Sequence, residues 1–163
     1  MTEKPDYAIC HAYTTLKSQD DLKFFVQLSC ELTGFNEVDL YGTGQVLTYY
    51  QIITDYLDKK DAKLATLFSG LSSTLFSSQN ETYLHKLING HGQPAKVAAS
   101  LIKLWYLGQW YNPDNANDTM IPSSQSYISG LVWTAIHAHP QGAKQQGFGA
   151  WSFPPLSEDQ GQA

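Results

Sequence analysis

The 163-residue sequence contains no arginine, because all ten of its basic residues are lysine. Without arginine the chain cannot form the bidentate guanidinium clamp that many proteins use to hold phosphate or carboxylate groups. The formal net charge of -5 also disfavours contact with a phosphate backbone. We therefore expect no nucleic-acid partner and no substrate site that depends on arginine.

Cysteine and long apolar runs are also scarce. Cys10 and Cys30 are too far apart for a metal motif, and the sequence does not indicate whether they form a disulfide. No window approaches the roughly 18 to 20 apolar residues of a membrane-spanning helix. The first residues lack a signal-peptide pattern, and the lack of arginine excludes a twin-arginine signal within this chain. We expect a soluble protein, cytoplasmic or periplasmic, with no direct membrane insertion.

The sequence does contain enough apolar residues for a core. Hydrophobic residues make up 42% and aromatic residues 13% of the chain, which predicts one domain over residues 1–163. Apolar positions recur at spacings of three and four, and no segment alternates with period two. This pattern predicts an all-α fold, a compact bundle of five to six helices. An irregular segment (1–17) precedes the helical body (18–139), and an extended arm (140–163) follows it.

Capping residues and glycines set the expected helix limits. Phe35–Tyr41 is expected to be a turn and Asn112–Pro122 a loop. The predicted helices are Gln19–Thr33 after a Ser18–Asp21 capping box, Val46 to Asp58–Asp61, Leu64–Leu75, a short helix capped by Asn80 and ended by Gly90-His91-Gly92, Pro94 to Gly108, and Ser124–His139 after Ser123.

The residues that carry catalysis in other proteins form no recognisable motif. His137 and His139 are the closest pair of histidines, but residues two apart on a helix point to nearly opposite sides. A partly buried histidine beside one exposed at a helix end explains this pair more simply than a metal ion. The chain has no Gly-x-Ser-x-Gly elbow, and neither cysteine has a signature of activation. We predict no catalytic residue and no metal site.

Cofactor motifs are missing as well. Gly42-Thr43-Gly44 has no preceding strand, so a turn before a helix explains it better than a dinucleotide site. Four aromatic residues at helical spacing, Trp105, Tyr106, Trp110 and Tyr111, are open to two interpretations. They could line a ligand pocket, but this spacing favours core and interface positions. We expect no cofactor in this chain.

The last part of the sequence differs from the helical body. Gly142, Gly147 and Gly149 alternate with large aromatic residues, and Pro154-Pro155 follows. This composition predicts an extended arm whose rings pack either on its own domain or on another protein. Aromatic anchors of this kind are typical of protein interfaces, so the residues favour binding over catalysis.

Three blocks resemble one known family. They are FFVQLSCELTGF (Phe24–Phe35), AASLIKLWYLGQWY (Ala98–Tyr111) and SYISGLVWTAIHAHPQGAKQQGFGAWSFPP (Ser126–Pro155). In order and spacing they resemble the small subunits of bacterial membrane-bound FAD-dependent sugar and polyol dehydrogenases, the D-sorbitol dehydrogenase small-subunit family. The resemblance implies a noncatalytic subunit of an oxidoreductase complex, without FAD of its own.

In that family the FAD and the chemistry belong to a large flavoprotein subunit, and a cytochrome subunit often passes electrons to the membrane. The small subunit stabilises the large one, and in many members its twin-arginine signal carries the folded flavoprotein into the periplasm. This chain lacks that signal. The resemblance therefore implies partner binding more directly than export.

Carrying the motif positions over gives a set of candidate interface residues. Trp105 and Tyr127 also fit simple core positions, whereas Trp151 and Phe153 fit partner contacts better. Two other interpretations stay open: a stand-alone domain that binds a small molecule with the Trp and Tyr cluster, and a protein that self-associates through its arm. The candidates are Trp105, Tyr106, Gly108, Tyr127, Trp133, Phe148, Trp151, Phe153 and Pro154.

Overall fold

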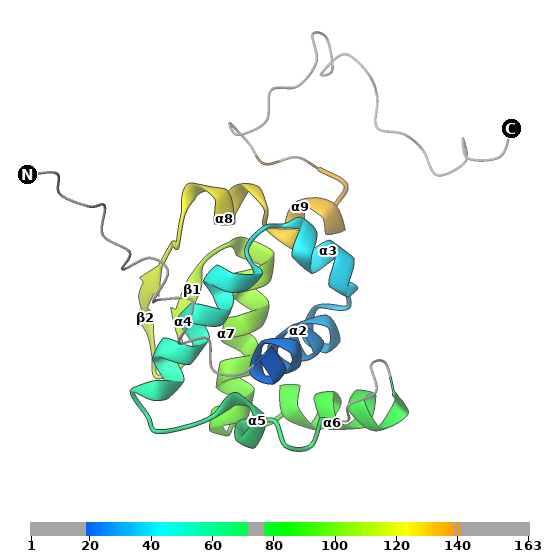
Figure 1. The fold of residues 1–163 in the computed structure, drawn as a ribbon, viewed down its shortest axis with the longest axis vertical. Helices are drawn as coiled ribbons and strands as arrows, with labels where there is room; N and C mark the ends of the chain where they lie inside the picture. The colour runs from blue at the N-terminus through cyan, green and yellow to red at the C-terminus, as the bar shows by residue number, and fades with distance from the viewer. Residues whose placement is uncertain (1–18, 72–76, 139, 141–163) are drawn as a thin grey trace, which may run out of the picture.

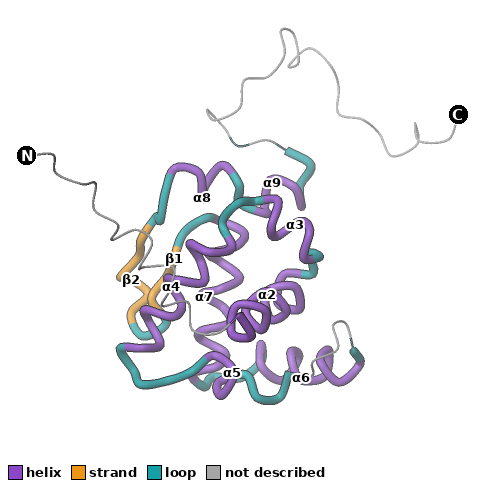
Figure 2. The backbone as a smooth tube through the Cα atoms, in the orientation of Figure 1, coloured by secondary structure: helices purple, strands orange, loops and turns teal. Residues whose placement is uncertain are grey.

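A computed structural model of the protein describes residues 19–71, 77–138 and 140 (Figure 1). Within them the fold is mostly helical, with one small two-stranded sheet (Figure 2). The expected irregular segment 1–17 and the arm beyond Pro140 lie outside the described residues. No helix in the described part of the chain is long and apolar enough to cross a membrane.

Three long helices form the centre of the body: α2 (Gln19–Thr33), α4 (Val46–Asp58) and α7 (Gln93–Leu107). All three were predicted, because each repeats apolar residues along one face and ends at a polar or glycine stop. Helix α7 is the central element, since α2, α6 (Ser78–Ile88), α9 (Leu131–Ala135) and the sheet all contact it. Gly108 ends α7 in the left-handed conformation.

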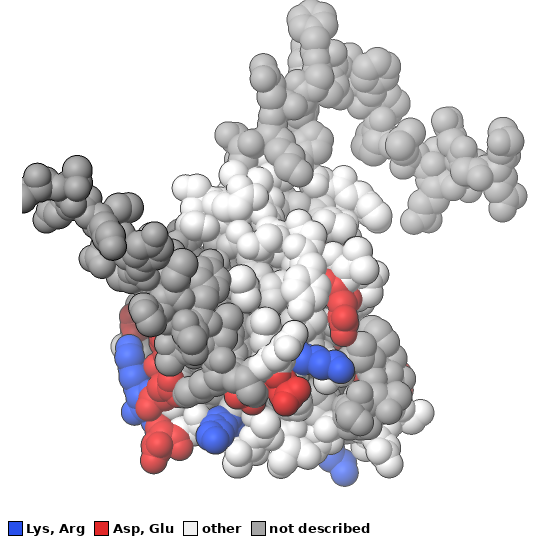
Figure 3. All heavy atoms as spheres, in the orientation of Figure 1, with Lys and Arg blue, Asp and Glu red and all other residues white. Residues whose placement is uncertain are grey.

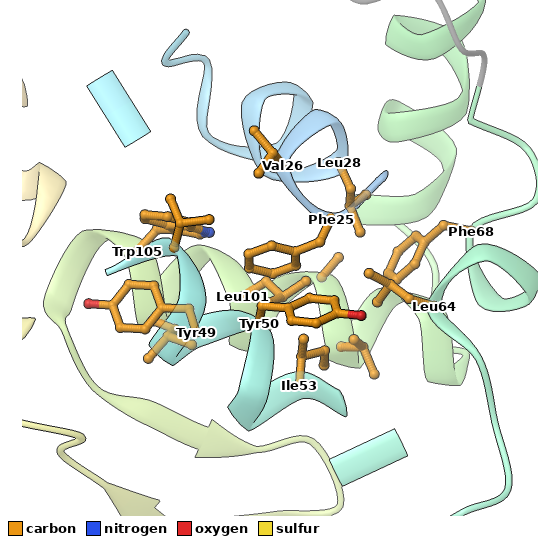
Figure 4. Close-up of a cluster of buried hydrophobic side chains, with 14 of the residues drawn as sticks. Phe25, Val26, Leu28, Tyr49, Tyr50, Ile53, Leu64, Phe68, Leu101 and Trp105 are labelled. Carbon is orange, nitrogen blue, oxygen red and sulfur yellow. The ribbon is translucent and has the colours of Figure 1, made fainter. Parts of the chain in front are cut away.

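The core between these helices is aromatic (Figure 4). The Trp105 ring stacks on Phe25 at 6.2 Å between centroids and meets Tyr49 edge-on at 4.8 Å. The Trp105 Nε1–H donates a hydrogen bond of 3.0 Å to the Ser29 Oγ. Truncation of a buried aromatic residue of this kind costs about 3 to 5 kcal/mol, so this cluster is a large contribution to stability.

The predicted all-α class was wrong in one place. The expected loop Asn112–Pro122 contributes to an antiparallel hairpin of β1 (Trp110–Asn112) and β2 (Asn115–Met120). The Trp110 ring anchors the hairpin edge-on against Tyr56, 5.7 Å between centroids. Sequence periodicity could not reveal these strands, because β1 is too short to alternate and every residue of β2 is exposed.

The expected turn at Phe35–Tyr41 is also wrong, because it contains the short helix α3 (Glu37–Gly42). Asn36 and Asp39 form a capping box that starts this helix, with the Asp39 N–H donating to the Asn36 Oδ1 at 2.9 Å. The expected helix Leu64–Leu75 is only α5 (Leu64–Leu67) in the described residues, and Leu75 lies outside them. Gly70 follows α5 with its backbone against the Tyr83 ring.

The N-cap residue of α6 was also predicted wrongly. Ser77, not Asn80, caps α6, because the Ser77 Oγ accepts the Asn80 backbone N–H at 3.2 Å. The Asn80 side chain is buried and donates to the Glu31 Oε1 at 3.0 Å, which joins α6 to α2.

The last predicted helix is two short helices, α8 (Ser124–Ile128) and α9. Ser123 caps α8 as expected. The helix breaks at Gly130, which lies against the Tyr106 carbonyl so closely that a Cβ there would be 2.6 Å from the oxygen. The chain therefore bends over the end of α7, and α8 and α9 cover this end of the body (Figure 1).

Alanine at two glycines separates the cost of a left-handed backbone from the cost of a steric clash. Gly34 (φ 76°) has open space around its Cα, whereas a Cβ on Gly108 (φ 66°) would overlap the Ser126 carbonyl. We expect Gly34→Ala to lower the free energy of unfolding by about 1 kcal/mol. Gly108→Ala should lower it by about 2 to 4 kcal/mol, because α8 must also move. Urea unfolding measures both, and equal losses would show that α8 does not press on α7.

Candidate partner-binding surface

Exposed large hydrophobic residues gather at one end of the described structure. Nine such residues are exposed, and eight of them lie in α3, the first turn of α4, the last turn of α7, the end of β2 and the residue after it, α8, and the residue that follows α9. These segments lie at the upper end in Figure 1, and Ile88 on α6 is the exception. We call this surface the apolar cap, which comprises Val38, Tyr41, Leu47, Leu107, Met120, Ile121, Tyr127 and Ile136 together with half-buried Trp133.

Buried polar contacts fix the cap to the body. The Ser126 Oγ donates a hydrogen bond of 3.0 Å to the Gln45 Oε1, which joins α8 to the start of α4. The Tyr106 hydroxyl donates to the Thr33 carbonyl at 2.9 Å and joins α7 to the end of α2. The close approach of Gly108 to Ser126 adds a third link. These contacts hold α8 in a fixed position against α4 and α7.

Two predicted interface residues meet within the cap. The rings of Tyr127 and Trp133 lie edge-on with centroids 5.4 Å apart. The Trp133 Nε1–H donates to the Tyr127 carbonyl at 2.8 Å. Tyr127 is 38% exposed, and Ile136, which directly follows α9, is 58% exposed. The pair offers a partner two aromatic faces without an unsatisfied indole N–H.

The cap is also poor in charge. No aspartate, glutamate or lysine occurs between Asp118 and Lys144, a stretch that includes α8 and α9. Figure 3 shows the same feature on the molecular surface, where the upper part of the described face is white and red atoms border it near α3. A surface that exposes large apolar side chains and carries no charge, as α8 and α9 do, is typical of the centre of a protein interface.

The other predicted interface residues lie elsewhere. Trp105 is only 1% exposed, so it takes the core position that its helical spacing allowed and is not on the surface of the body. Gly108 and half-buried Tyr106 support the cap from beneath. The arm positions Phe148, Trp151, Phe153 and Pro154 lie outside the described residues. The interface role of the whole set stays a prediction.

The sequence did contain signals for the cap residues that we missed. Val38 and Tyr41 were assigned to a turn, although Asn36 and Asp39 have the spacing of a capping box. Ile121 lies in the expected loop Asn112–Pro122, and Ile136 lies on the apolar side of the predicted helix Ser124–His139, so helical spacing indicated packing for a side chain that is 58% exposed. The long uncharged stretch that contains both of them was the usable signal.

A polar cluster holds the hairpin turn at the other side of the molecule. The Tyr56 hydroxyl donates to the Asp114 Oδ2 at 3.0 Å and accepts a short hydrogen bond from the Gln93 Nε2. Lys60 forms an ion pair of 2.7 Å with Asp114, and its hydrogen bond lowers the pKa of that carboxyl. Burial and the contact with Asp114 raise the pKa of the Tyr56 hydroxyl. Because these polar groups form hydrogen bonds and an ion pair with one another, we interpret the cluster as a structural contact that holds the hairpin turn against α4 and α7.

The reactive side chains in the described residues show no assembled site. Burial raises the pKa of the Cys30 thiol to about 11, so it is protonated at neutral pH and is a poor nucleophile. His85, His91 and His137 are exposed. No group of three metal-ligating side chains occurs among the described residues, and His139 and Cys10 are outside them.

The pocket interpretation of the aromatic cluster finds no support at its predicted place. Trp105 and Trp110 are buried in the core, where they pack on Phe25, Tyr49 and Tyr56. A cleft of about 490 Å³ lies instead between the start of α2 and α3. Its lining mixes both signs of charge with apolar groups: Gln19, Asp20, Leu22, Lys23, Val26, Glu37 and Tyr41.

Comparison with known proteins gives no further assignment. No family model, curated protein or solved structure matches this chain. Function is therefore inferred from the residues and geometry described above.

The polar cluster predicts a pH-dependent contribution to stability. The folded-state pKa of Asp114 is lowered, so its contribution is present above the unfolded pKa of about 4 and is lost as the pH falls through the folded value. Asp114→Asn should lower the free energy of unfolding at neutral pH by at most about 1 kcal/mol, because the ion pair is exposed. This difference from the unmodified chain should shrink as the pH falls below the unfolded pKa of about 4.

Urea unfolding at several pH values measures the effect, and a double-mutant cycle provides the control. With Lys60→Met already present, Asp114→Asn should cost less than it does alone, since the ion pair has been removed. A cost that is independent of both pH and Lys60 would show that Asp114 does not fasten the hairpin through this pair.

Proposed function

We propose that this chain is a noncatalytic small subunit that binds the large flavoprotein subunit of an FAD-dependent sugar or polyol dehydrogenase. The apolar cap is the observation that supports partner binding. The resemblance of Phe24–Phe35, Ala98–Tyr111 and Ser126–Pro155 to the sorbitol dehydrogenase small-subunit family supplies the class of partner. In this proposal the FAD and the chemistry belong to the partner.

The composition of the cap suits a stable interface. Tyr127 and Trp133 are of the residue types that dominate binding energy, and the aliphatic residues around them exclude water. The Trp133 indole N–H already donates to a carbonyl of its own chain. A partner can therefore cover the ring without leaving a buried donor unsatisfied.

The lack of charge favours the same role. Burial of an unpaired charge in an interface costs several kcal/mol, and α8 and α9 carry none. Association therefore gains the burial of apolar area without this penalty. A large subunit with a matching apolar face would be stabilised when the cap covers it, which is the role of an assembly or export partner.

The same proposal implies a complex with a third, cytochrome subunit. A cytochrome subunit that accepts electrons from the flavoprotein would bind the large subunit, and the small subunit would take no part in electron transfer. The complex would be periplasmic and associated with the membrane through those partners. The small subunit would contribute stability and correct assembly.

Recovery of the partner from the native host tests the proposal. Tagged chain should bring down a flavoprotein, identified by mass spectrometry, flavin absorbance and polyol-dependent dye reduction. Ile136→Asp should lower this recovery tenfold or more, equivalent to about 1.4 kcal/mol, because a charge enters the apolar interface.

The matched control is Ile88→Asp, which places the same charge on an equally exposed isoleucine outside the cap. It should recover as much flavoprotein as the unmodified chain. Flavin held by the isolated chain itself, or equal recovery by both variants, would contradict the proposal.

The contribution of the predicted arm requires a separate experiment. A chain that ends at Pro140 lacks Phe148, Trp151, Phe153 and Pro154. If these residues contact the flavoprotein, this shorter chain should recover less of it while unfolding at the same urea concentration as the full chain. Unchanged recovery would restrict the interface to the cap.

A further inference from the structure

The charges of the described residues lie away from the end that carries α8 and α9. Charged residues occur in α2, in α4 and the turn after it, in α6, in α7 (Lys96 and Lys103) and in the hairpin, while α3 carries Glu37 and Asp39 beside the cap residues Val38 and Tyr41. Residues 119–138 contribute none. In Figure 3 the uppermost part of the described face is white, and red and blue atoms occur among white atoms from the level of α3 downward.

This separation decides how two copies of the chain can approach each other. Each copy has a formal net charge of -5, so most orientations bring like charges together. Helix α7 runs from the lower, charged end to the cap, and its 15 residues span about 22 Å at a rise of about 1.5 Å per residue. That length exceeds the Debye length of about 8 Å at physiological salt. Two chains that meet through α8 and α9 therefore keep the charges at the lower end of the body beyond effective repulsion, and Glu37 and Asp39 of α3 lie outside this central contact.

We infer that the apolar cap is self-complementary and that two copies of this chain associate through it as a twofold dimer when no other partner covers it. The central contacts are Tyr127 on α8, Trp133 on α9 and Ile136 directly after α9, with exposed Leu107 at the end of α7. A twofold axis places the same surface on both sides of the interface, so one uncharged surface satisfies both copies.

This dimer goes beyond the proposed function, because its partner is a second copy of the chain. The dimer and the complex with a flavoprotein use the same surface and exclude each other. Formation of the dimer would protect the cap from nonspecific aggregation until the flavoprotein is present. The flavoprotein then has to compete with the dimer, so its apparent affinity falls as the concentration of free small subunit rises.

The mass of the purified full-length chain in solution tests the inference. Sedimentation velocity should show a species of twice 18.2 kDa whose population grows with concentration. A range of about 1 to 100 µM covers the dissociation constants of interfaces of modest area. Ile136→Asp should weaken the dimer tenfold or more, whereas Ile88→Asp, with 64% exposure outside the cap, should dimerise like the unmodified chain.

Each other result overturns the inference. A monomeric chain throughout this range, or equal dimerisation by the two variants, would show that the cap does not bind a second copy. A dimer that is lost when the chain ends at Pro140 but survives Ile136→Asp would assign self-association to the arm. A monomer that binds phosphatidylcholine vesicles and loses this binding in Ile136→Asp would assign the cap to lipid.

The outcome is separable from that of the proposed function. A chain that recovers a flavoprotein but stays monomeric overturns the dimer alone. A dimeric chain that recovers no flavoprotein overturns the subunit proposal alone. Circular dichroism of both variants checks that they fold, and both substitutions are at exposed positions where folding should tolerate them.

Discussion

The position of the Trp105 indole determines how the three long helices meet. Its ring lies between Phe25 of α2 and Tyr49 of α4, and its N–H donates to the Ser29 Oγ. The Ser29 hydroxyl in turn donates to the Phe25 carbonyl at 2.8 Å. Because these polar groups are fully buried, rotation of α7 would break hydrogen bonds that water cannot replace. The indole therefore fixes the position of α7 against α2 and α4, and the end of α7 supports α8 and α9.

The two ends of the body have different physical roles. At the lower end, Lys60, Asp114 and Tyr56 satisfy one another and fasten the hairpin to α4 and α7. At the upper end, Ser126 points inward to Gln45, while large aliphatic and aromatic side chains such as Tyr127 and Ile136 are exposed. The polar groups stabilise the body, and the apolar surface that remains outside is available for binding.

Sequence periodicity predicted α2, α4 and α7 because each has a long apolar face that packs against the others. It missed the hairpin and α3, because they are too short for a period and depend on contacts of Trp110 and on the Asn36 cap. The break at Gly130 comes from a tertiary contact with Tyr106, which no local pattern contains. Within the candidate site, the sequence named Tyr127 and Trp133 as interface candidates, and helical spacing already allowed the core position that Trp105 takes, whereas Tyr127, which also fitted the core, is 38% exposed.

Hydrogen exchange in the complex tests the central claim most directly, namely that the uncharged end of the body is the surface that a partner covers. The amides of residues 119–138 should exchange more slowly in the complex with the flavoprotein than in the free Ile136→Asp variant, which is expected to stay monomeric. The reason is that a partner that covers α8 and α9 suppresses their local opening. The amides of α6, which carries the isolated Ile88, should be unchanged. Protection confined to α5 and α6, with none over residues 119–138, would contradict the account.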